Sequence, residues 1–320
     1  FIISGPHLTK MGHVQHCADL LAAKGIPSDA FSETEGNPSV ATVDKAAKAF
    51  KESGADFIVA FGGGSPMDVA KAVAVVAKYG GSVTDYEGAD KVPGDIIPLI
   101  AIPTTAGTGS EVTAFSVVKA NAEKLVLVDP SLLPDIAILD PALVASVPPA
   151  ITADTGMDVL CHALEAYVSR AASDFSDALA EKVVQQVFRY LPTCWRSGDN
   201  LLAREKMHNA SCMAGMAFTN ASLGITHSLA HALGGVFRVP HGRANALLMA
   251  EVVAWNADYH GQCATDAARK YARLAHLLDL PAANTRQGVA SLLVAIQTLK
   301  DEMTMPAGIS DTGISSAEFE

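Results

Sequence analysis

Apolar residues in the first half of the chain form short continuous runs, separated by stretches in which one helical face is apolar. Strands that are apolar throughout and alternate with helices are typical of a parallel sheet covered on both faces. The first half therefore predicts an α/β domain. The predicted strands are residues 1–4, 56–61, 96–102, 125–128 and 136–139, and the predicted helices between them are 13–24, 39–53 and 66–78.

The pattern changes near residue 148, after which strand-like runs stop and helical periodicity dominates. The segment Val147-Pro148-Pro149 is the best domain boundary, because consecutive prolines interrupt regular structure. We therefore predict an α/β domain at residues 1–147 and an all-α domain at residues 148–320. The abrupt apolar start at Phe1 and the end at Glu320 without a terminal signal indicate truncation at both ends. The predicted helices are 152–170, 175–191, 201–218, 222–233, 243–260, 265–277 and 285–302.

Composition narrows the class of protein. A hydrophobic fraction of 49% with 18% charged residues suits a compact globular chain. The net charge of -11 argues against a nucleic-acid partner, which needs clustered Lys and Arg. No apolar run approaches the roughly 18 residues of a membrane span. The five cysteines are scattered without a CxxC pair, so we predict neither a disulfide framework nor a zinc knuckle, and a cytoplasmic location.

The predicted strand at 56–61 leads directly into Gly62-Gly63-Gly64-Ser65-Pro66. Glycines let the backbone approach a ligand closely, Ser65 suits a helix N-cap, and Pro66 suits the first helical position. Asp68, three residues after Ser65, would complete a capping box. A helix N-terminus after such a turn binds anions through free N–H groups, and a dinucleotide pyrophosphate fits it.

A second loop follows the predicted strand at 96–102 and contains Thr104, Thr105, Gly107, Thr108 and Gly109. Two such loops at the carboxyl ends of parallel strands define a crevice, which is the usual ligand site of an open Rossmann-like sheet. The ordinary GxGxxG fingerprint is absent, and the first loop alone is equally typical of a tight turn that caps a helix. Together the two loops favour a nucleotide site.

Acidic and imidazole side chains recur at helical spacing in the second half. Asp158 and His162 lie four residues apart, as do His227 and His231, and His241 stands at the start of a further predicted helix. Each histidine alone is more typical of a structural residue than of a ligand. One carboxylate with two or three imidazoles suits iron or zinc, and the spacing does not distinguish His227 from His231.

These motifs together resemble the iron-containing (group III) alcohol dehydrogenases along nearly the whole chain. The resemblance rests on residues 62–68, 103–111, 155–167 and 227–242. It implies a dehydroquinate synthase-like architecture, with a dinucleotide-binding α/β domain, a helical metal-binding domain and an active site in the cleft between them. It also implies a homodimer and hydride transfer between NAD or NADP and a small primary alcohol or aldehyde such as ethanol, propanol, 1,3-propanediol or lactaldehyde.

The resemblance assigns roles to individual residues. The metal, with iron preferred over zinc, would be held by Asp158, His162, His227 and His241, and His231 would relay protons. Ser32 occupies the place where many NAD-preferring relatives carry an Asp, so NADP use stays open, and Glu33 or Glu35 would be a substitute carboxylate. The cofactor contacts carried over are Gly62, Gly63, Gly64, Ser65, Asp68, Thr104, Thr105 and Thr108, with Lys124 and Leu143 as further contacts.

Two other classes of function are alternatives to a dehydrogenase. A sugar-phosphate cyclising lyase resembling dehydroquinate synthase would share the architecture, but it would need more Lys and Arg near the metal than Arg170, Arg238 and Arg243. A non-catalytic nucleotide or metal sensor would not need the intact ligand set. Candidate residues for lining the substrate pocket are Phe115, Ala153, Phe218 and Leu223.

Overall fold

The computed structural model describes residues 1–120 and 123–314, and the chain divides into two compact units. The predicted boundary after residue 147 lies close to the division that the structure shows after Leu143. Residues 315–320, at the end of the predicted second domain, lie outside the described residues. The first unit comprises Phe1–Thr105 and Gly109–Leu143, and the second comprises Ala106–Thr108 and Val144–Glu320.

The first unit is built on a five-stranded sheet with the order β2-β1-β3-β5-β8, in which every neighbouring pair is parallel. Its central strands β3 and β5 are continuous apolar segments, which is the pattern expected of a sheet covered on both faces. The parallel α/β fold predicted from the sequence is thus confirmed. The strands are β1 (Ile2–Ile3), β2 (Ala30–Phe31), β3 (Ile58–Gly62), β5 (Leu99–Pro103) and β8 (Ile136–Ala137).

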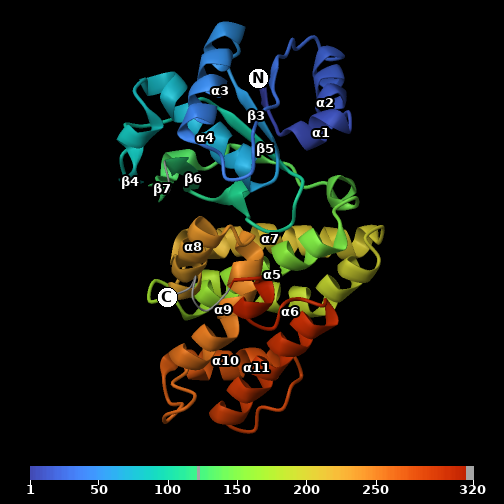
Figure 1. The fold of residues 1–320 in the computed structure, drawn as a ribbon, viewed down its shortest axis with the longest axis vertical. Helices are drawn as coiled ribbons and strands as arrows, with labels where there is room; N and C mark the ends of the chain where they lie inside the picture. The colour runs from blue at the N-terminus through green and yellow to red at the C-terminus, as the bar shows by residue number, and fades with distance from the viewer. Residues whose placement is uncertain (121–122, 315–320) are drawn as a thin grey trace. The chain divides into compact units, whose positions relative to one another are not determined.

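Alternate residues of these strands enter two different apolar clusters. Ile58 and Ala60 pack on the side of α3 (Val40–Ser53) and α4 (Gly64–Tyr79). Val59 and Phe61 pack on the side of α1 (Pro6–Lys10) and α2 (His13–Ala22). Figure 1 shows these two helix pairs on opposite faces of the sheet. The carboxyl ends of β3 and β5, where the two predicted loops begin, therefore lie next to each other.

The segment at 125–128 was predicted as a strand of the parallel sheet, and this was wrong. It belongs to β7 (Glu123–Val128), which pairs antiparallel with β6 (Phe115–Ala120) and parallel with β4 (Gly88–Ala89) in a separate three-stranded sheet. The pattern of apolar residues along one segment indicates whether that segment is buried. Which strand it pairs with depends on contacts with residues distant in sequence. The strand β6 was missed because its apolar residues are interleaved with Ser116 and Lys119.

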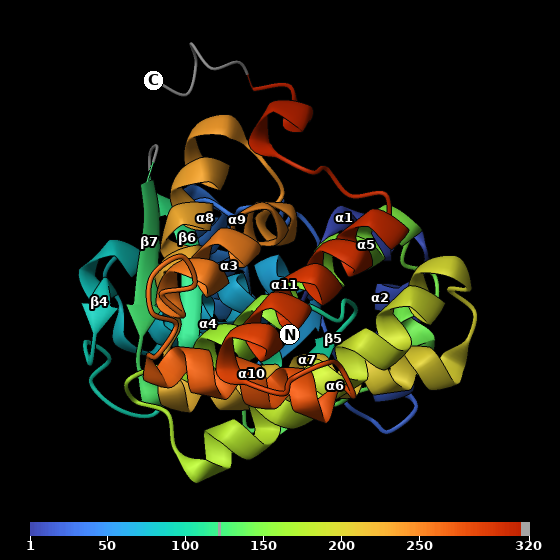
Figure 2. The ribbon, with the colours of Figure 1, turned by 90° about the horizontal axis from the view of Figure 1, so that it is seen from below.

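The second unit is helical, and α5 (Pro149–Val168) is its most buried helix. Its faces pack against α6, α7 and α9, while α8 packs on α9 and α10 on α11 (Figures 1 and 2). The all-α prediction for this part is confirmed. The other helices are α6 (Asp174–Arg196), α7 (Leu201–Ala221), α8 (Ile225–Phe237), α9 (His241–Asn256), α10 (Asp266–Leu277) and α11 (Thr285–Glu302).

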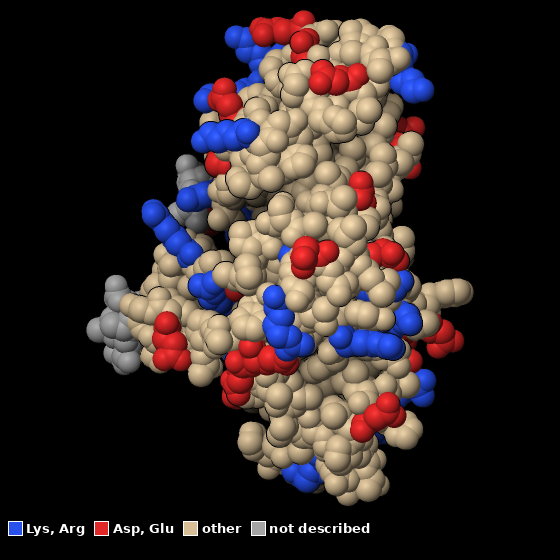
Figure 3. Space-filling view, turned by 90° about the vertical axis from the view of Figure 1, so that its right-hand side faces the viewer, with Lys and Arg blue, Asp and Glu red and all other residues tan. Residues whose placement is uncertain are grey.

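Within residues 1–120 and 123–314, no helix combines the length and the apolar character needed to cross a bilayer. Acidic and basic side chains are interspersed on the face of the molecule that Figure 3 shows, with wide uncharged areas between them. That mixed distribution differs from the clustered basic surface that polyanion binding requires.

Candidate active site

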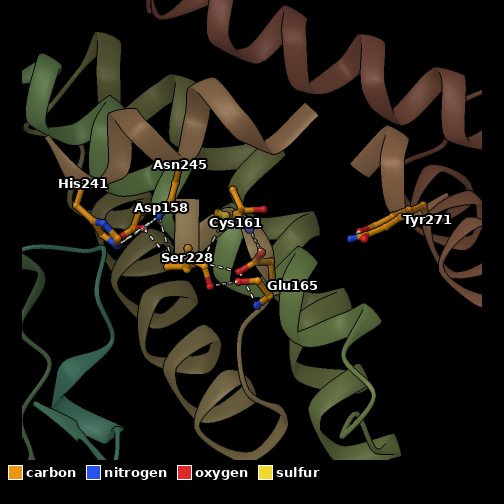
Figure 4. A network of polar contacts seen from close by, with 11 residues as sticks. Asp158, Cys161, Glu165, Ser228, His241, Asn245 and Tyr271 are labelled. Atoms are coloured by element: carbon orange, nitrogen blue, oxygen red, sulfur yellow. Dashed lines mark hydrogen bonds and ion pairs between the residues drawn. The ribbon is translucent and has the colours of Figure 1, made fainter. Parts of the chain in front are cut away.

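Three helices of the second unit bring polar donors together in its interior. Asp158 lies on α5, His227 on α8 and His241 is the first residue of α9. The Oδ1 atom of Asp158 lies 3.6 Å from Nε2 of His227 and 3.6 Å from Nε2 of His241. Figure 4 shows Asp158 and His241 pointing toward one another from their separate helices. Residues 83 positions apart in sequence thus meet at one point.

His162 lies one turn after Asp158 on α5, and its ring stacks on that of His227 with centroids 4.5 Å apart. The ring of Phe218 stacks on the same imidazole with centroids 4.4 Å apart. In the described part of the chain, Nδ1 of His162 has no hydrogen-bond partner although it is buried. Burial lowers the pKa of His162 to about 4, so the imidazole is neutral near pH 7 and keeps a lone pair. Its ring nitrogens do not join the cluster of Asp158, His227 and His241.

The Glu165 carboxylate orients His227 from the far side of the imidazole. Its Oε2 lies 2.6 Å from Nδ1 of His227, and its two oxygens also accept from the backbone N–H groups of Gly224 and Thr226 at the start of α8. Burial alone would raise the pKa of Glu165, but these bonds lower it to about 2. An ionised Glu165 accepts from Nδ1 of His227. Burial alone would lower the pKa of His227, but Cys161, Asp158 and Glu165 together raise that pKa well above its usual value. A metal ion would displace the proton on Nε2, because Glu165 keeps the other proton on Nδ1.

Charges inside the cluster favour an ionised Asp158. Burial alone would raise the pKa of this carboxyl, but three neighbouring imidazoles outweigh burial and lower the pKa well below its usual value. The site therefore presents one carboxylate and imidazole nitrogens that would exchange their protons for a metal ion. That donor set is the one preferred by divalent iron and zinc.

The spacing of the donors fits a metal ion. A tetrahedral site with bonds of about 2.1 Å places its donor atoms about 3.4 Å apart. The separations from Asp158 to His227 and to His241 are 3.6 Å, close to that value. The unpartnered Nδ1 of His162 is a further buried donor beside the same rings. These separations are compatible with ligands of one divalent metal ion.

A close approach of two helices holds His241 in place. A Cβ atom on Gly242 would lie 2.0 Å from the backbone oxygen of Asp154 on α5, so only glycine allows this contact. Next to it, Arg243 makes two hydrogen bonds of 3.1 Å to the Asp154 carboxylate. Both contacts fix the first turn of α9 against α5, and they set the distance from His241 to Asp158.

His231, predicted as a proton relay, lies one turn after His227 on α8 and is partly exposed. Its ring centroid is 5.1 Å from that of His241 and 6.5 Å from that of His227. It is therefore beside the donor cluster but not in it. The choice between His227 and His231, which the sequence spacing left open, is made by the rotation of α8 about its axis.

The two predicted cofactor loops lie against each other in the first unit. The N–H of Thr104 donates to the carbonyl of Gly62 at 2.9 Å, and a Cβ on Gly63 would lie 3.1 Å from Oγ1 of Thr105. Gly62 has φ +156°, and a Cβ there would lie 2.6 Å from Cγ of Pro66. The glycines are therefore needed for the turn itself and for the contact between the loops.

The predicted capping box at Ser65 and Asp68 is wrong. The helix α4 begins at Gly64 with Gly63 as its N-cap, so Ser65 lies inside the first turn. Asp68 instead accepts a hydrogen bond of 3.3 Å from Oγ of Ser110, in the second loop. Glycine at the N-cap leaves the N–H groups of the first turn without a capping side chain, and these groups can serve an anion.

A buried lysine joins α4 to the segment that follows the second loop. Nζ of Lys71, which is 0% exposed, donates to the carbonyls of Thr113 and Phe115 at 2.7 and 2.8 Å and contacts the Ser110 hydroxyl at 3.2 Å. Two acidic groups, Asp68 and Glu111, lie near enough to raise its pKa, against a larger lowering by burial. No feature of the sequence marked Lys71, because a lysine on an apolar helix face is read as exposed.

Glu111 is expected to make the protein less stable as the pH rises. Burial raises its pKa from 4.5 to about 7, against smaller lowering effects of a backbone hydrogen bond and Lys71, and its Oε1 has no partner among the described residues. Because the folded chain binds this proton more tightly than the unfolded chain, stability falls between about pH 4.5 and pH 7. The full cost above pH 7 is about 3 kcal/mol.

The variant Glu111→Gln should therefore be more stable than the parent at pH 8, by up to about 3 kcal/mol, and nearly equal to it at pH 4.5. Urea unfolding at both pH values measures the difference. A variant that is less stable than the parent at pH 8 would show that the attraction to Lys71 outweighs burial.

The remaining predicted cofactor residues are spread over both units. Ser32 directly follows the edge strand β2, Lys124 lies on β7 and Leu143 packs against the apolar cluster on the side of α1 and α2. Thr108 belongs with Ala106 and Gly107 to the second unit. Glu35 is fully engaged at the start of α3, where it accepts from Ser39 and Thr42. It is not a free carboxylate next to Ser32.

Sequence reasoning missed two side chains of the metal site. Glu165 lies seven residues after Asp158, on the same face of α5, and that spacing was a usable signal. Asn245 lies four residues after His241 on α9, and its amide faces the donor atoms. Asn carries no distinctive signal in a helix, so only its placement reveals it.

A parallel α/β unit with two glycine-containing loops, together with a helical unit that buries a carboxylate and imidazoles, defines the class of metal-dependent dehydrogenases. Residues 1–141 match the family model of iron-containing alcohol dehydrogenase. Residues 152–320 match the model of the C-terminal part of the Fe-containing alcohol dehydrogenase family. The chain belongs to the iron-containing alcohol dehydrogenase family.

Individual relatives agree with this assignment. The chain is 44% identical over 311 residues to the 1-propanol dehydrogenase PduQ of Citrobacter freundii, covering 96% of this chain and 79% of that protein. The crystal structure of a 1,3-propanediol oxidoreductase is similar with a TM-score of 0.94 and 35% identity, over 99% of this chain and 82% of that one. The crystal structure of sulfoacetaldehyde reductase from Bifidobacterium kashiwanohense in complex with NAD+ is similar with a TM-score of 0.86 and 34% identity. The match covers 99% of this chain and 81% of that one.

The predicted reaction class is thereby confirmed. The protein is an oxidoreductase that transfers a hydride between an alcohol or aldehyde and a nicotinamide cofactor, and it depends on a metal. The sugar-phosphate lyase is not supported, because both family models that match are those of alcohol dehydrogenases.

Proposed function

We propose that this enzyme interconverts short primary alcohols and their aldehydes at a divalent metal held by Asp158, His162, His227 and His241. The observation that carries the proposal is that Nε2 of His227 and Nε2 of His241 each lie 3.6 Å from Oδ1 of the buried Asp158. Iron is the preferred metal because the family is iron-containing, and zinc accepts the same donors. The names of the relatives support 1-propanol and 1,3-propanediol as substrates.

The chain's own residues prepare the site for this reaction. Asp158 and the neutral imidazoles bind the ion, and Glu165 keeps the lone pair on Nε2 of His227 directed at it. When bound, the metal supplies Lewis acidity toward the alcohol oxygen and the cofactor supplies the hydride acceptor. His231, partly exposed beside His241, takes the hydroxyl proton and releases it to solvent, since imidazole titrates near neutral pH.

The cofactor is proposed to bind through the loops of Gly62–Ser65 and Thr104–Thr105. Uncapped N–H groups at the start of α4 would donate hydrogen bonds to the pyrophosphate. Asp68, Thr108, Lys124 and Leu143 remain proposed contacts, although Asp68 already accepts from Ser110. Their substitution should raise KM for the cofactor more than it lowers kcat.

A panel of C2–C4 alcohols and aldehydes, assayed with both cofactors on protein of known metal content, tests the proposed substrate class. We expect the highest kcat/KM with 1-propanol, 1,3-propanediol or their aldehydes. Absence of any change in NADH or NADPH absorbance with these compounds, in protein with a full complement of metal, would exclude this substrate class.

We propose that Ser32 lets the enzyme use NADP as well as NAD. Ser32 directly follows β2 and carries no charge that would repel a 2′-phosphate, and Glu35 is engaged at α3, which leaves the exposed Glu33 as the neighbouring carboxylate. The variant Ser32→Asp should lower kcat/KM for NADP by at least about tenfold, because like charges would repel, while NAD is retained. The ratio of kcat/KM for the two cofactors measures this, and an unchanged ratio would show that Ser32 does not face the 2′ position.

We also propose that the enzyme is a homodimer of the cytoplasm. The resemblance to the family supports the dimer, and the five cysteines, none of which forms a disulfide, suit a reducing compartment. Sedimentation equilibrium of the purified enzyme tests the first statement, and a mass of one chain would contradict it.

A further inference from the structure

The side-chain amide of Asn245 contacts each of the three donor atoms. Its Nδ2 is 2.7 Å from Oδ1 of Asp158, 3.1 Å from Nε2 of His227 and 3.3 Å from Nε2 of His241. The side chain is 0% exposed and stands one turn after His241 on α9. Figure 4 shows it directed at Asp158 and His241.

The hydrogen-bond directions fix the orientation of this amide. The ionised Asp158 carboxylate can only accept, and its Oδ1 is the atom nearest to Nδ2 of Asn245, at 2.7 Å. Only the NH2 end of Asn245 can face such acceptors. With the amide reversed, its carbonyl oxygen would lie against a carboxylate oxygen. Accordingly Oδ1 of Asn245 points away, and it has no hydrogen-bond partner in the described ranges.

The charge of this residue matters as much as its hydrogen bonds. Asp158 is the carboxylate of the described cluster that faces the donor point, since Glu165 lies behind His227. A divalent cation with one carboxylate and neutral imidazoles keeps a net positive charge, which Lewis-acid catalysis requires. Aspartate has the same shape as asparagine, and at position 245 it would place a second carboxylate beside Asp158.

We propose that Asn245 is a positioning residue that holds the Asp158 carboxylate for the metal and, by being neutral, preserves the positive charge of the loaded site. The inference rests on the proposed metal ligands. It predicts that two changes of similar size act in opposite directions on metal affinity. Both changes are expected to reduce turnover per enzyme molecule, one by lowering kcat per bound metal and the other by lowering the amount of bound metal.

The variants Asn245→Asp and Asn245→Leu separate the two roles. In Asn245→Asp, we expect Zn²⁺ or Co²⁺ to bind at least about tenfold more tightly, because a second carboxylate faces the ion. Its kcat per bound metal should fall at least about tenfold, and the pH of half-maximal kcat should rise, because the less electrophilic ion makes the alcohol proton harder to remove. In Asn245→Leu, metal affinity should fall about 10- to 100-fold, while kcat per bound metal changes little.

Chelator competition with Zn²⁺, the visible spectrum of Co²⁺ and thermal unfolding of the metal-free proteins provide readouts that are independent of turnover. The matched control is Asn256→Asp, the same charge change on the same helix, where the amide contacts the Tyr271 hydroxyl at 3.4 Å. It should leave metal affinity and kcat per bound metal unchanged. If Asn245→Leu does not fold, Asn245→Ser, which keeps a donor, should bind metal with an intermediate affinity.

The outcomes distinguish this inference from the proposed function. An unaltered enzyme that binds no metal, or that keeps its metal affinity in Asp158→Ala, contradicts the proposed ligands. Suppose instead that metal binding is lost in Asp158→Ala, while Asn245→Asp keeps both the metal affinity and the kcat per bound metal of the parent. That result overturns the inference about Asn245 and leaves the proposed ligands intact.

Discussion

The variant His241→Ala is expected to lose its metal and at least about 1,000-fold of its turnover, while it binds NADH as tightly as the parent enzyme. A metal acting as Lewis acid contributes several kcal/mol to the stabilisation of the transition state. About 4 kcal/mol corresponds to a factor of roughly 1,000 in rate. The proposed cofactor loops at Gly62–Ser65 and Thr104–Thr105 belong to the first unit, whereas His241 belongs to the second.

The reason lies in the geometry around Asp158. His241 is one of the two imidazoles whose Nε2 lies 3.6 Å from Oδ1 of Asp158. Alanine removes this donor and leaves a gap at a site that is partly open to water, because the His241 side chain is 31% exposed. Atomic absorption of the purified variant and NADH fluorescence titration measure the two halves of the prediction.

The control for this experiment is His276→Ala, which removes an exposed histidine from the last turn of α10. It should keep the metal content and turnover of the parent. A His241→Ala enzyme with full metal content and full turnover would exclude His241 from the ligand set. Loss of NADH binding together with the metal would instead show that the substitution disturbs the whole protein.

The variant Gly242→Ala is expected to weaken metal binding at least about tenfold and to lower the free energy of unfolding by about 1–3 kcal/mol or more. The added Cβ would lie 2.0 Å from the backbone oxygen of Asp154 and 2.6 Å from its carbonyl carbon. Backbone atoms of a buried helix cannot rotate away as a side chain can. The first turn of α9 must therefore move off α5, and His241 moves with it.

The matched control is Gly235→Ala on the neighbouring helix α8, where an added Cβ meets nothing within 4 Å. Because alanine favours the helix, this variant should be as stable as the parent or more stable by up to about 1 kcal/mol. Urea unfolding and chelator competition on both variants give the comparison. Equal metal affinity in Gly242→Ala and the parent would show that the α5–α9 contact does not set the position of His241.

Local pattern was sufficient for the long helices and the central strands of this protein and for part of its chemistry, but not for β6 or the short strands. Continuous apolar runs alternating with helical faces predicted the parallel sheet, and unbroken helical periodicity predicted the second unit. Both follow from the period of each element, which any segment shows by itself. The spacing of Asp158 and His162 likewise placed them on one face of a helix, because residues four apart are neighbours there.

The tertiary structure decided which of these residues meet. The rotation of α8 turns His227, and not His231, toward Asp158, and that rotation depends on packing against other helices. The tertiary structure also determined that β7 pairs with β6 outside the parallel sheet. Contacts of this kind join segments distant in sequence, so no local pattern contains them.

The supporting residues show the same division. Helical spacing placed the donors of α5 on one face, but it did not show that Glu165 would reach the first N–H groups of α8 and the ring of His227. Nor did it show that Asn245 would face Asp158 from α9. Periodicity determines which side of a helix a residue occupies, whereas the close packing of whole helices determines what lies opposite it.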